Sequence, residues 1–150
     1  MIDDRMTRGI ITGAVAAVVQ NVYIFGAHMA GFTKVDYEDY AEMVFFSKLL
    51  PGFFPSFLGL IGHLVWDIFL GIIFAYIIKY SSSRFYVLKG MVFGAFVWWL
   101  VKVSCTLFRL PGLSTPSYRQ VGVFLIGALL FGVVTAYTLK LLDAKCETMD

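Results

Sequence analysis

The chain has 150 residues, of which 59% are hydrophobic and 17% are aromatic, and its mean hydropathy is +0.80. A water-soluble domain of this length carries a far more polar surface, so the composition excludes an ordinary soluble protein. The formal net charge is only +2, and no basic patch with interleaved aromatic residues lies outside the apolar stretches, which excludes nucleic acid as a partner. We therefore expect an integral membrane protein in contact with the lipid bilayer.

Four apolar stretches are long enough to cross a membrane as helices. A hydrocarbon core of ~30 Å needs about 20 helical residues. Little of the chain is left outside these stretches, so the sequence predicts a single all-α, polytopic membrane domain over residues 1–150, built as a four-transmembrane-helix bundle. The predicted spans are Gly9 to Ala30, Pro55 to Tyr80, Phe85 to Phe108 and Tyr118 to Leu142.

The segment between the first two spans, Thr33 to Leu50, is rich in acidic and aromatic residues. Thr33 and Asp36 have the spacing of a helix capping box, with Asp in place of the usual Glu or Gln. Pro51 then ends the segment. The pattern predicts a short interfacial helix, which we interpret as an aromatic anchor among the lipid headgroups, with a lid or a partner-binding surface as the alternative.

Two motifs occur twice, in the same order. The first motif opens a helix and the second closes the next one, so both halves should run the same way through the bilayer. Residues 8–79 and 89–140 are therefore predicted to form a 2+2 parallel internal repeat, related by an axis along the membrane normal. The matched segments are Arg8 to Ala14 with Lys89 to Ala95, and Gly71 to Lys79 with Gly132 to Lys140.

Small residues recur at intervals of four along each span. Helices in lipid associate through close packing and polar contacts rather than through hydrophobic burial, so these stripes predict the faces that touch other helices. Glycines at this spacing indicate packing and not activity. The glycines expected at helix contacts are Gly9, Gly13, Gly59, Gly71, Gly90, Gly94 and Gly132.

Polar side chains share one depth within the spans. Asn21, Asp67 and Lys102 each lie twelve residues from the predicted cytoplasmic end of their helix, which is about 18 Å. An ionised group at such depth costs roughly 2.5 to 3.5 kcal/mol on insertion scales and needs a partner. We expect Asp67 and Lys102 to form an ion pair, which either fixes the helix register or belongs to a site for a proton, ion or polar solute. Alternatively, Lys102 extends outward to the interface and leaves Asp67 protonated.

Gln20 and His63 extend this polar layer. Gln20 adjoins Asn21, while His63 lies one turn from Asp67, where an imidazole and a carboxylate can orient one another or pass a proton. The plainer interpretation of His63 is a hydrogen-bonded interior residue. His28 has a depth similar to that of His63, and two such histidines are the minimum for bis-imidazole ligation of haem b. Otherwise we expect no cofactor, no metal site and no catalytic residue, and therefore not an enzyme.

The opening RGIITG, the Gln20-Asn21 pair and the closing GVVTAYTLK together resemble small four-span bacterial membrane proteins of unassigned function. The resemblance covers most of the chain. It implies a protein of the bacterial inner (cytoplasmic) membrane and carries over no activity and no site residue.

Basic residues near the span ends predict the orientation. Seven of them fall on one side of the predicted bundle and four on the other. Because Lys and Arg concentrate on the cytoplasmic side of membrane proteins, both termini are predicted to be cytoplasmic. The seven are Arg5, Arg8, Lys79, Arg84, Lys89, Lys140 and Lys145, and the four are Lys34, Lys48, Arg109 and Arg119.

These features predict a small integral membrane protein with a buried polar layer, acting in transport or in the conduction of ions or protons. Four short helices scarcely enclose a pathway, so a homo-oligomer is expected. Two alternatives stay open. One is a non-catalytic partner subunit or assembly factor that docks on another membrane protein, and the other is a haem b electron-transfer protein.

Overall fold

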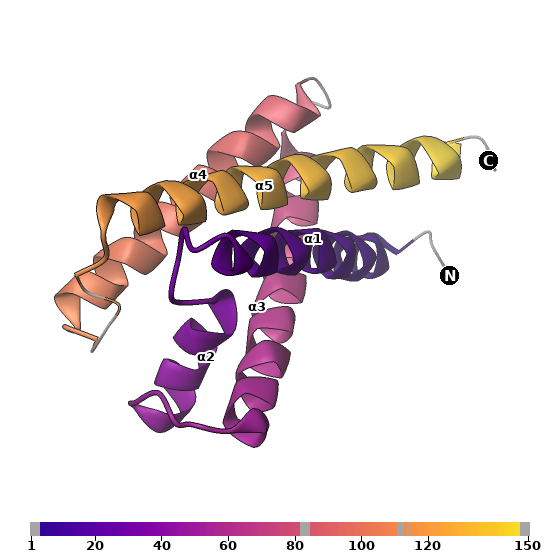
Figure 1. The fold of residues 1–150 in the computed structure, drawn as a ribbon. Coiled ribbons are helices and arrows are strands. Elements are labelled where there is room, and N and C mark those ends of the chain that lie inside the picture. Colours follow the sequence, from indigo (N-terminus) through magenta and orange to yellow (C-terminus); the bar gives the residue numbers. More distant parts are fainter. Residues whose placement is uncertain (1–3, 82–84, 111–112, 114, 148–150) are drawn as a thin grey trace.

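The computed structural model describes residues 4–81, 85–110, 113 and 115–147, so Arg84, which was counted for the orientation, lies outside the described residues. The described chain is helical and contains no strand. Four long helices, all except α2, are apolar enough to cross a membrane, which confirms the four long apolar helices expected and indicates a multi-pass membrane protein. The elements are α1 (Arg5–Met29), α2 (Tyr37–Phe46), α3 (Phe53–Tyr80), α4 (Tyr86–Leu107) and α5 (Tyr118–Glu147) (Figure 1).

Three of the long helices extend beyond the predicted spans: α3 begins at Phe53, just before the predicted start at Pro55, and α1 and α5 extend further. α1 begins at Arg5 because the Asp4 carboxylate caps it, accepting a hydrogen bond from the Thr7 N–H at 3.0 Å. α5 continues to Glu147, past the predicted end at Leu142. Apolar periodicity defines only the part of a helix that faces lipid or core, so these polar terminal turns were not included in the predicted spans.

The long helices form two crossed pairs. α1 packs on α3, α4 packs on α5, and α1 also packs along α5. α3 and α4 barely touch one another. Figure 1 shows α1 and α5 side by side in front of α3 and α4, with both ends of the chain on the same side of the molecule.

Glycines allow the first pair to cross closely. A Cβ atom placed on Gly13 of α1 would lie 2.5 Å from the carbonyl oxygen of Asp67, and one on Gly71 of α3 would lie 2.5 Å from that of Gly9. These contacts are backbone to backbone, so no side chain can move aside to admit a larger residue. The crossing therefore requires glycine.

The second pair crosses through the same type of contact. A Cβ atom on Gly94 of α4 would lie 2.1 Å from the carbonyl oxygen of Ala128, and one on Gly132 of α5 would lie 2.0 Å from that of Gly90. All six glycines expected at helix contacts in these two pairs are thus points of close approach: Gly9, Gly13, Gly71, Gly90, Gly94 and Gly132. Gly59 is used differently, because it faces the Glu38 carbonyl of α2 and not another long helix.

The predicted short helix between the first two long helices is confirmed as α2. Its capping box joins Asp36 and Asp39, and the Asp36 N–H donates to Asp39 Oδ2 at 2.7 Å. The predicted box of Thr33 and Asp36 is wrong, because the Thr33 hydroxyl bonds to the backbone of Val35 in a local turn. The helix ends at Phe46, and its C-cap residue Ser47 adopts a left-handed conformation with φ 57°.

One face of α2 is buried in the protein. Tyr37, Glu42 and Met43 have little exposed surface, and Glu42 Oε1 accepts a hydrogen bond from the Leu50 N–H. This face of α2 is therefore part of the packed structure, while Val44 and Phe45 of the same helix are exposed. That the segment anchors the protein among lipid headgroups stays a prediction.

A charged cluster joins the four long helices at one end of the molecule. Asp143 of α5 accepts hydrogen bonds from Arg5 at 2.8 Å, from Arg8 at 2.6 Å and from the Tyr86 hydroxyl at 2.8 Å. Arg5 Nε also donates to the carbonyl oxygen of Ala75 in α3 at 2.9 Å. Charge-assisted hydrogen bonds of this kind are stronger than neutral ones. The sequence analysis used Arg5 and Arg8 only for orientation and did not predict this cluster.

Candidate functional site

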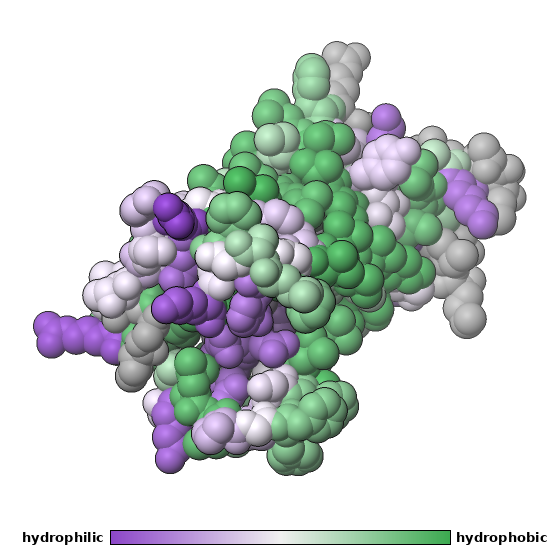
Figure 2. Space-filling model, in the orientation of Figure 1, coloured by the Kyte–Doolittle hydropathy of each residue, from purple (hydrophilic) through white to green (hydrophobic). Residues whose placement is uncertain are grey.

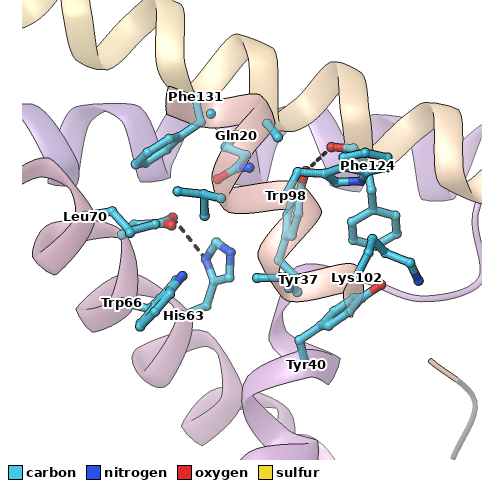
Figure 3. A pocket seen from close by; sticks show the side chains of 15 residues that line it. Gln20, Tyr37, Tyr40, His63, Trp66, Leu70, Trp98, Lys102, Phe124 and Phe131 are labelled. Carbon is cyan, nitrogen blue, oxygen red and sulfur yellow. Dashed lines mark hydrogen bonds and ion pairs between the residues drawn. The ribbon is translucent and has the colours of Figure 1, made fainter. Parts of the chain in front are cut away.

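A cavity of about 100 Å³ lies between α3 and α4, and all five helices contribute to its wall. Gln20, His63, Asp67 and Lys102 of the expected polar layer line this cavity together (Figure 3). Asn21 does not, because its side-chain amide donates to the Ala17 carbonyl of its own helix at 2.8 Å. Four of the five residues of the expected polar layer therefore line one common space.

Asp67 and His63 face one another inside this cavity. Asp67 is 2% exposed and His63 is 7% exposed, and His63 Nδ1 lies 3.1 Å from Asp67 Oδ2 (dashed in Figure 3). The angles do not form a hydrogen bond, and neither atom has another partner among the described residues. The two groups are thus held at ion-pair distance, with capacity left to bind a third group.

The expected ion pair between Asp67 and Lys102 is not formed. Lys102 Nζ instead donates to the carbonyl oxygen of Leu113 at 3.1 Å, and Figure 3 shows the lysine pointing away from His63. A long lysine stem can carry its ammonium toward the end of the helix, where a backbone carbonyl is available. This geometry corresponds to the alternative in which Lys102 extends outward.

Four buried polar atoms on the cavity wall have no hydrogen-bond partner in the described chain. They are the side-chain oxygen of Gln20, Nδ1 of His63, Oδ2 of Asp67 and the indole nitrogen of Trp98. A buried polar group left unpaired costs about 1 to 3 kcal/mol, and most buried polar groups in proteins are paired. Four such groups around one space can all be satisfied by a polar ligand or by water bound there.

Aromatic side chains form much of the remaining wall. The Tyr37 ring lies 4.9 Å from the imidazole of His63 and 4.8 Å from the ring of Phe124, and Tyr40 lies 5.2 Å from Phe124 (centroid distances). The Tyr37 hydroxyl reaches the Phe124 carbonyl oxygen on α5 at 3.5 Å. The complete aromatic set is Tyr37, Tyr40, Trp66, Trp98, Phe124 and Phe131.

Sequence reasoning missed the contribution of α2 to this wall. Tyr37 and Tyr40 are three residues apart, a spacing that puts both rings on one face of a helix. That spacing was the available signal. It does not tell whether the face turns toward lipid headgroups or toward the other helices, and the structure turns it inward.

His28 belongs to a second, more open groove of about 570 Å³ that Asn21, Asp36 and Glu38 also line. Its Nδ1 lies 2.7 Å from Asp36 Oδ2, and Figure 2 shows hydrophilic side chains gathered around α2. His28 and His63 therefore line different spaces, each beside its own carboxylate. Ligation of haem b by these two histidines stays a prediction.

The acidic side chains of α2 near this groove have altered proton affinity. Burial, followed by the negative charges of Asp36 and Asp39, raises the pKa of Glu38. Burial also raises the pKa of Asp39, against the hydrogen bond from the Asp36 N–H, which lowers it. Glu38 and Asp39 therefore hold protons more tightly than isolated carboxylates do.

Asp67 lies near the middle of α3, so the cavity is about equally far from the two ends of that helix. The site thus combines a carboxylate, an imidazole, an amide and an indole N–H within an aromatic wall. No protein-family model, no curated protein and no solved structure matches this chain.

Proposed function

We propose that the protein is a multi-pass protein of the cytoplasmic membrane that binds a small polar solute or ion in the central cavity and moves it across the bilayer. One observation carries this proposal. Four buried polar atoms that have no hydrogen-bond partner among the described residues converge on one space, halfway along a helix that is long and apolar enough to span a membrane. Ionisable groups at such depth are costly, and in membrane proteins they mark solute and proton pathways.

Packing alone is a poor explanation for this set of groups. A carboxylate and an imidazole facing an otherwise aromatic space stabilise the fold less than apolar residues of the same volume. Their presence is explained if an occupant of the cavity supplies the missing hydrogen bonds. Many transporters bind their solute near the bilayer midplane, between two helix units.

We also propose that the α1–α3 and α4–α5 pairs are the two halves of a parallel internal repeat. The matching glycine contacts support this proposal, since Gly13 faces the Asp67 carbonyl as Gly94 faces the Ala128 carbonyl. In the repeat, Asp67 and Ala128 are equivalent positions, so only one half supplies an acid. The cavity then lies between the halves, and its charge comes from the place where the halves differ.

Flux through reconstituted liposomes tests the transport proposal. The liposomes contain a pH-sensitive dye for protons, and labelled tetramethylammonium, acetate and urea are supplied outside as probes. We expect flux of at least one probe, or of protons, that Asp67→Asn lowers by about tenfold or more. Asn21→Ala is the matched control, because Asn21 has the same depth and lies outside the cavity wall.

Transport is the wrong function if the parent protein moves none of these probes and no protons. It is also wrong if Asp67→Asn and Asn21→Ala lower the flux equally, because the effect would then not arise from the cavity.

A second candidate is a subunit that acts through another membrane protein or through a second copy of itself. The observation that favours it is that other helices cover α4 less than they cover the rest. In the most apolar stretch of α4, 17% of the residues are buried, against 33% in the corresponding stretch of each of the other three long helices. Phe96, Trp99 and Val103 are exposed on α4. Native mass spectrometry in a mild detergent tests this candidate: a defined dimer or a stoichiometric complex supports it, and a monomer contradicts it.

A further inference from the structure

We propose that the solute of the central cavity is a small organic cation. This inference rests on the proposed function and names the chemical class that the cavity recognises. Three features of the wall carry it: the charge of the acid, the aromatic side chains around it and the direction of the lysine.

Asp67 is the only acidic side chain that lines this cavity in the described chain. It is almost fully buried, and its Oδ2 has no hydrogen-bond partner in the part of the chain that the structure describes. A carboxylate in such surroundings is stable as an anion only when a positive charge reaches it. His63 at 3.1 Å can supply that charge by holding a proton, and a cationic solute can supply it instead.

The aromatic wall suits a cation that carries apolar groups. The faces of Trp, Tyr and Phe attract cations, and quaternary ammonium groups are commonly recognised by aromatic cages. Tyr37 and Trp98 come from different helices, α2 and α4, and six aromatic residues of the described chain line the cavity. Such a wall also excludes water, which strengthens the attraction between the cation and Asp67.

An anion is less well accommodated. Lys102 is the only basic side chain other than His63 on the described wall, and its ammonium already donates to the Leu113 carbonyl oxygen. Figure 3 shows that it points away from His63, so its charge lies away from the unpaired carboxylate. Of the unpaired atoms, the oxygens of Gln20 and Asp67 are acceptors, which suit an N–H donor or a positive charge.

The volume limits the size of this cation. A cavity of about 150 Å³ holds benzene, and this cavity measures about 100 Å³. A solute of about five non-hydrogen atoms, such as tetramethylammonium or methylguanidinium, has a suitable size.

Proton release accompanies the binding of such a cation. In the empty site one proton held by Asp67 and His63 keeps the couple neutral, and when the cation binds, that proton leaves to the solvent while the carboxylate remains ionised. The other titratable groups on the wall are Tyr37 and Tyr40 from α2 and Lys102 from α4, while α1 and α5 contribute none. The affinity for the cation should therefore fall as the pH is lowered.

Tryptophan fluorescence of the purified full chain measures this binding, because Trp66 and Trp98 line the cavity. Titration with tetramethylammonium chloride should give a saturable change. Asp67→Asn should weaken the affinity by about tenfold or more, since it removes the only negative charge. Lys102→Met should tighten the affinity, because it removes a positive charge from the cavity wall, and Asn21→Ala should leave the affinity unchanged. If Asp67→Asn does not fold, Asp67→Glu keeps the charge and should still bind the cation.

Each alternative occupant gives a different result. Binding of acetate that Lys102→Met abolishes would identify an anion site and overturn the inference, while the transport proposal would stand. Equal binding of tert-butanol, a neutral molecule of similar shape, by the parent and by Asp67→Asn would also overturn it. If tetramethylammonium does not bind but another probe crosses liposomes, the inference alone fails. If no probe binds and none crosses, both proposals fail.

Discussion

At the scale of single residues, the partner of Asp67 comes from its own helix. The sequence gives Asp67 and Lys102 the same depth, but depth does not define the direction in which a side chain leaves its helix. His63 is four residues from Asp67, and that contact follows from helix geometry alone. Lys102 finds a backbone carbonyl near the end of α4. The polar residues of the cavity could therefore be predicted from the sequence, whereas their partners could not.

A double-mutant cycle tests this pairing. We expect a coupling free energy of about 1 kcal/mol or more between Asp67→Asn and His63→Gln, because the two side chains are in direct contact. The cycle between Asp67→Asn and Lys102→Met is the control and should give less than about 0.5 kcal/mol. Unfolding free energies in mixed micelles provide the four values for each cycle. Strong coupling to Lys102 and none to His63 would contradict the geometry of the cavity.

At the scale of the elements, α2 differs most from expectation. A short acidic and aromatic helix was predictable from its composition and from the capping residues near Asp36. Its inward orientation depends on Gly59, where the backbone of α2 approaches α3, and on Tyr37, which reaches α5. Such contacts join segments that are distant in sequence, and the sequence alone does not show which distant segments meet.

The pKa of Glu38 gives a pH dependence to the docking of α2. Because burial raises the pKa of Glu38, the docked helix binds a proton more tightly than the undocked helix does, so docking strengthens as the pH falls. We expect α2 amides to be better protected from hydrogen exchange at about pH 5 than at about pH 7, after correction for intrinsic rates.

Glu38→Gln is the control for this dependence and should reduce it, because the amide does not titrate. A loss of protection on acidification in the parent protein would have the opposite sign and would refute the argument.

A glycine at a helix crossing and a glycine away from any crossing should respond differently to replacement by alanine. Gly132→Ala should destabilise the protein by about 1 to 3 kcal/mol, because the new methyl group would overlap the Gly90 carbonyl. Gly26→Ala in α1 is the matched control, since nothing lies within 4 Å of its Cβ position. Alanine there should be neutral or stabilise the helix by up to about 1 kcal/mol. Thermal unfolding in detergent compares the two, and equal effects would mean that α4 and α5 do not cross at Gly132.

At the scale of the whole molecule, the two helix pairs are joined asymmetrically. α1 and α5 pack together, while α3 and α4 leave the cavity between them. The sequence indicated helices with small-residue stripes, and it indicated which glycines lie at contacts. Every long helix carries such a stripe, however, so the sequence alone could not tell which helices join one pair to the other.

The orientation of the molecule can be tested at Cys146. Both ends of the described chain lie on one side of the molecule in Figure 1, and the excess of basic residues near the helix ends on that side predicts that it is cytoplasmic. Cys105 is buried, so Cys105→Ser provides a single-thiol protein with little background. We expect a membrane-impermeant maleimide to label Cys146 in opened membranes and not in intact cells. Rapid labelling in intact cells would reverse the orientation.

The Asp143 cluster has a consequence for the order in which the protein is made. Arg5 and Asp143 are 138 residues apart, so the carboxylate that binds the first helix is synthesised only with the last one. Until α5 enters the membrane, α1 lacks both the packing surface of α5 and this countercharge. The first helix can therefore reach its final arrangement only after the last helix has been made. A chain stalled on the ribosome before residue 143 would contain α1 and α3, but α1 would lack its contacts with Asp143.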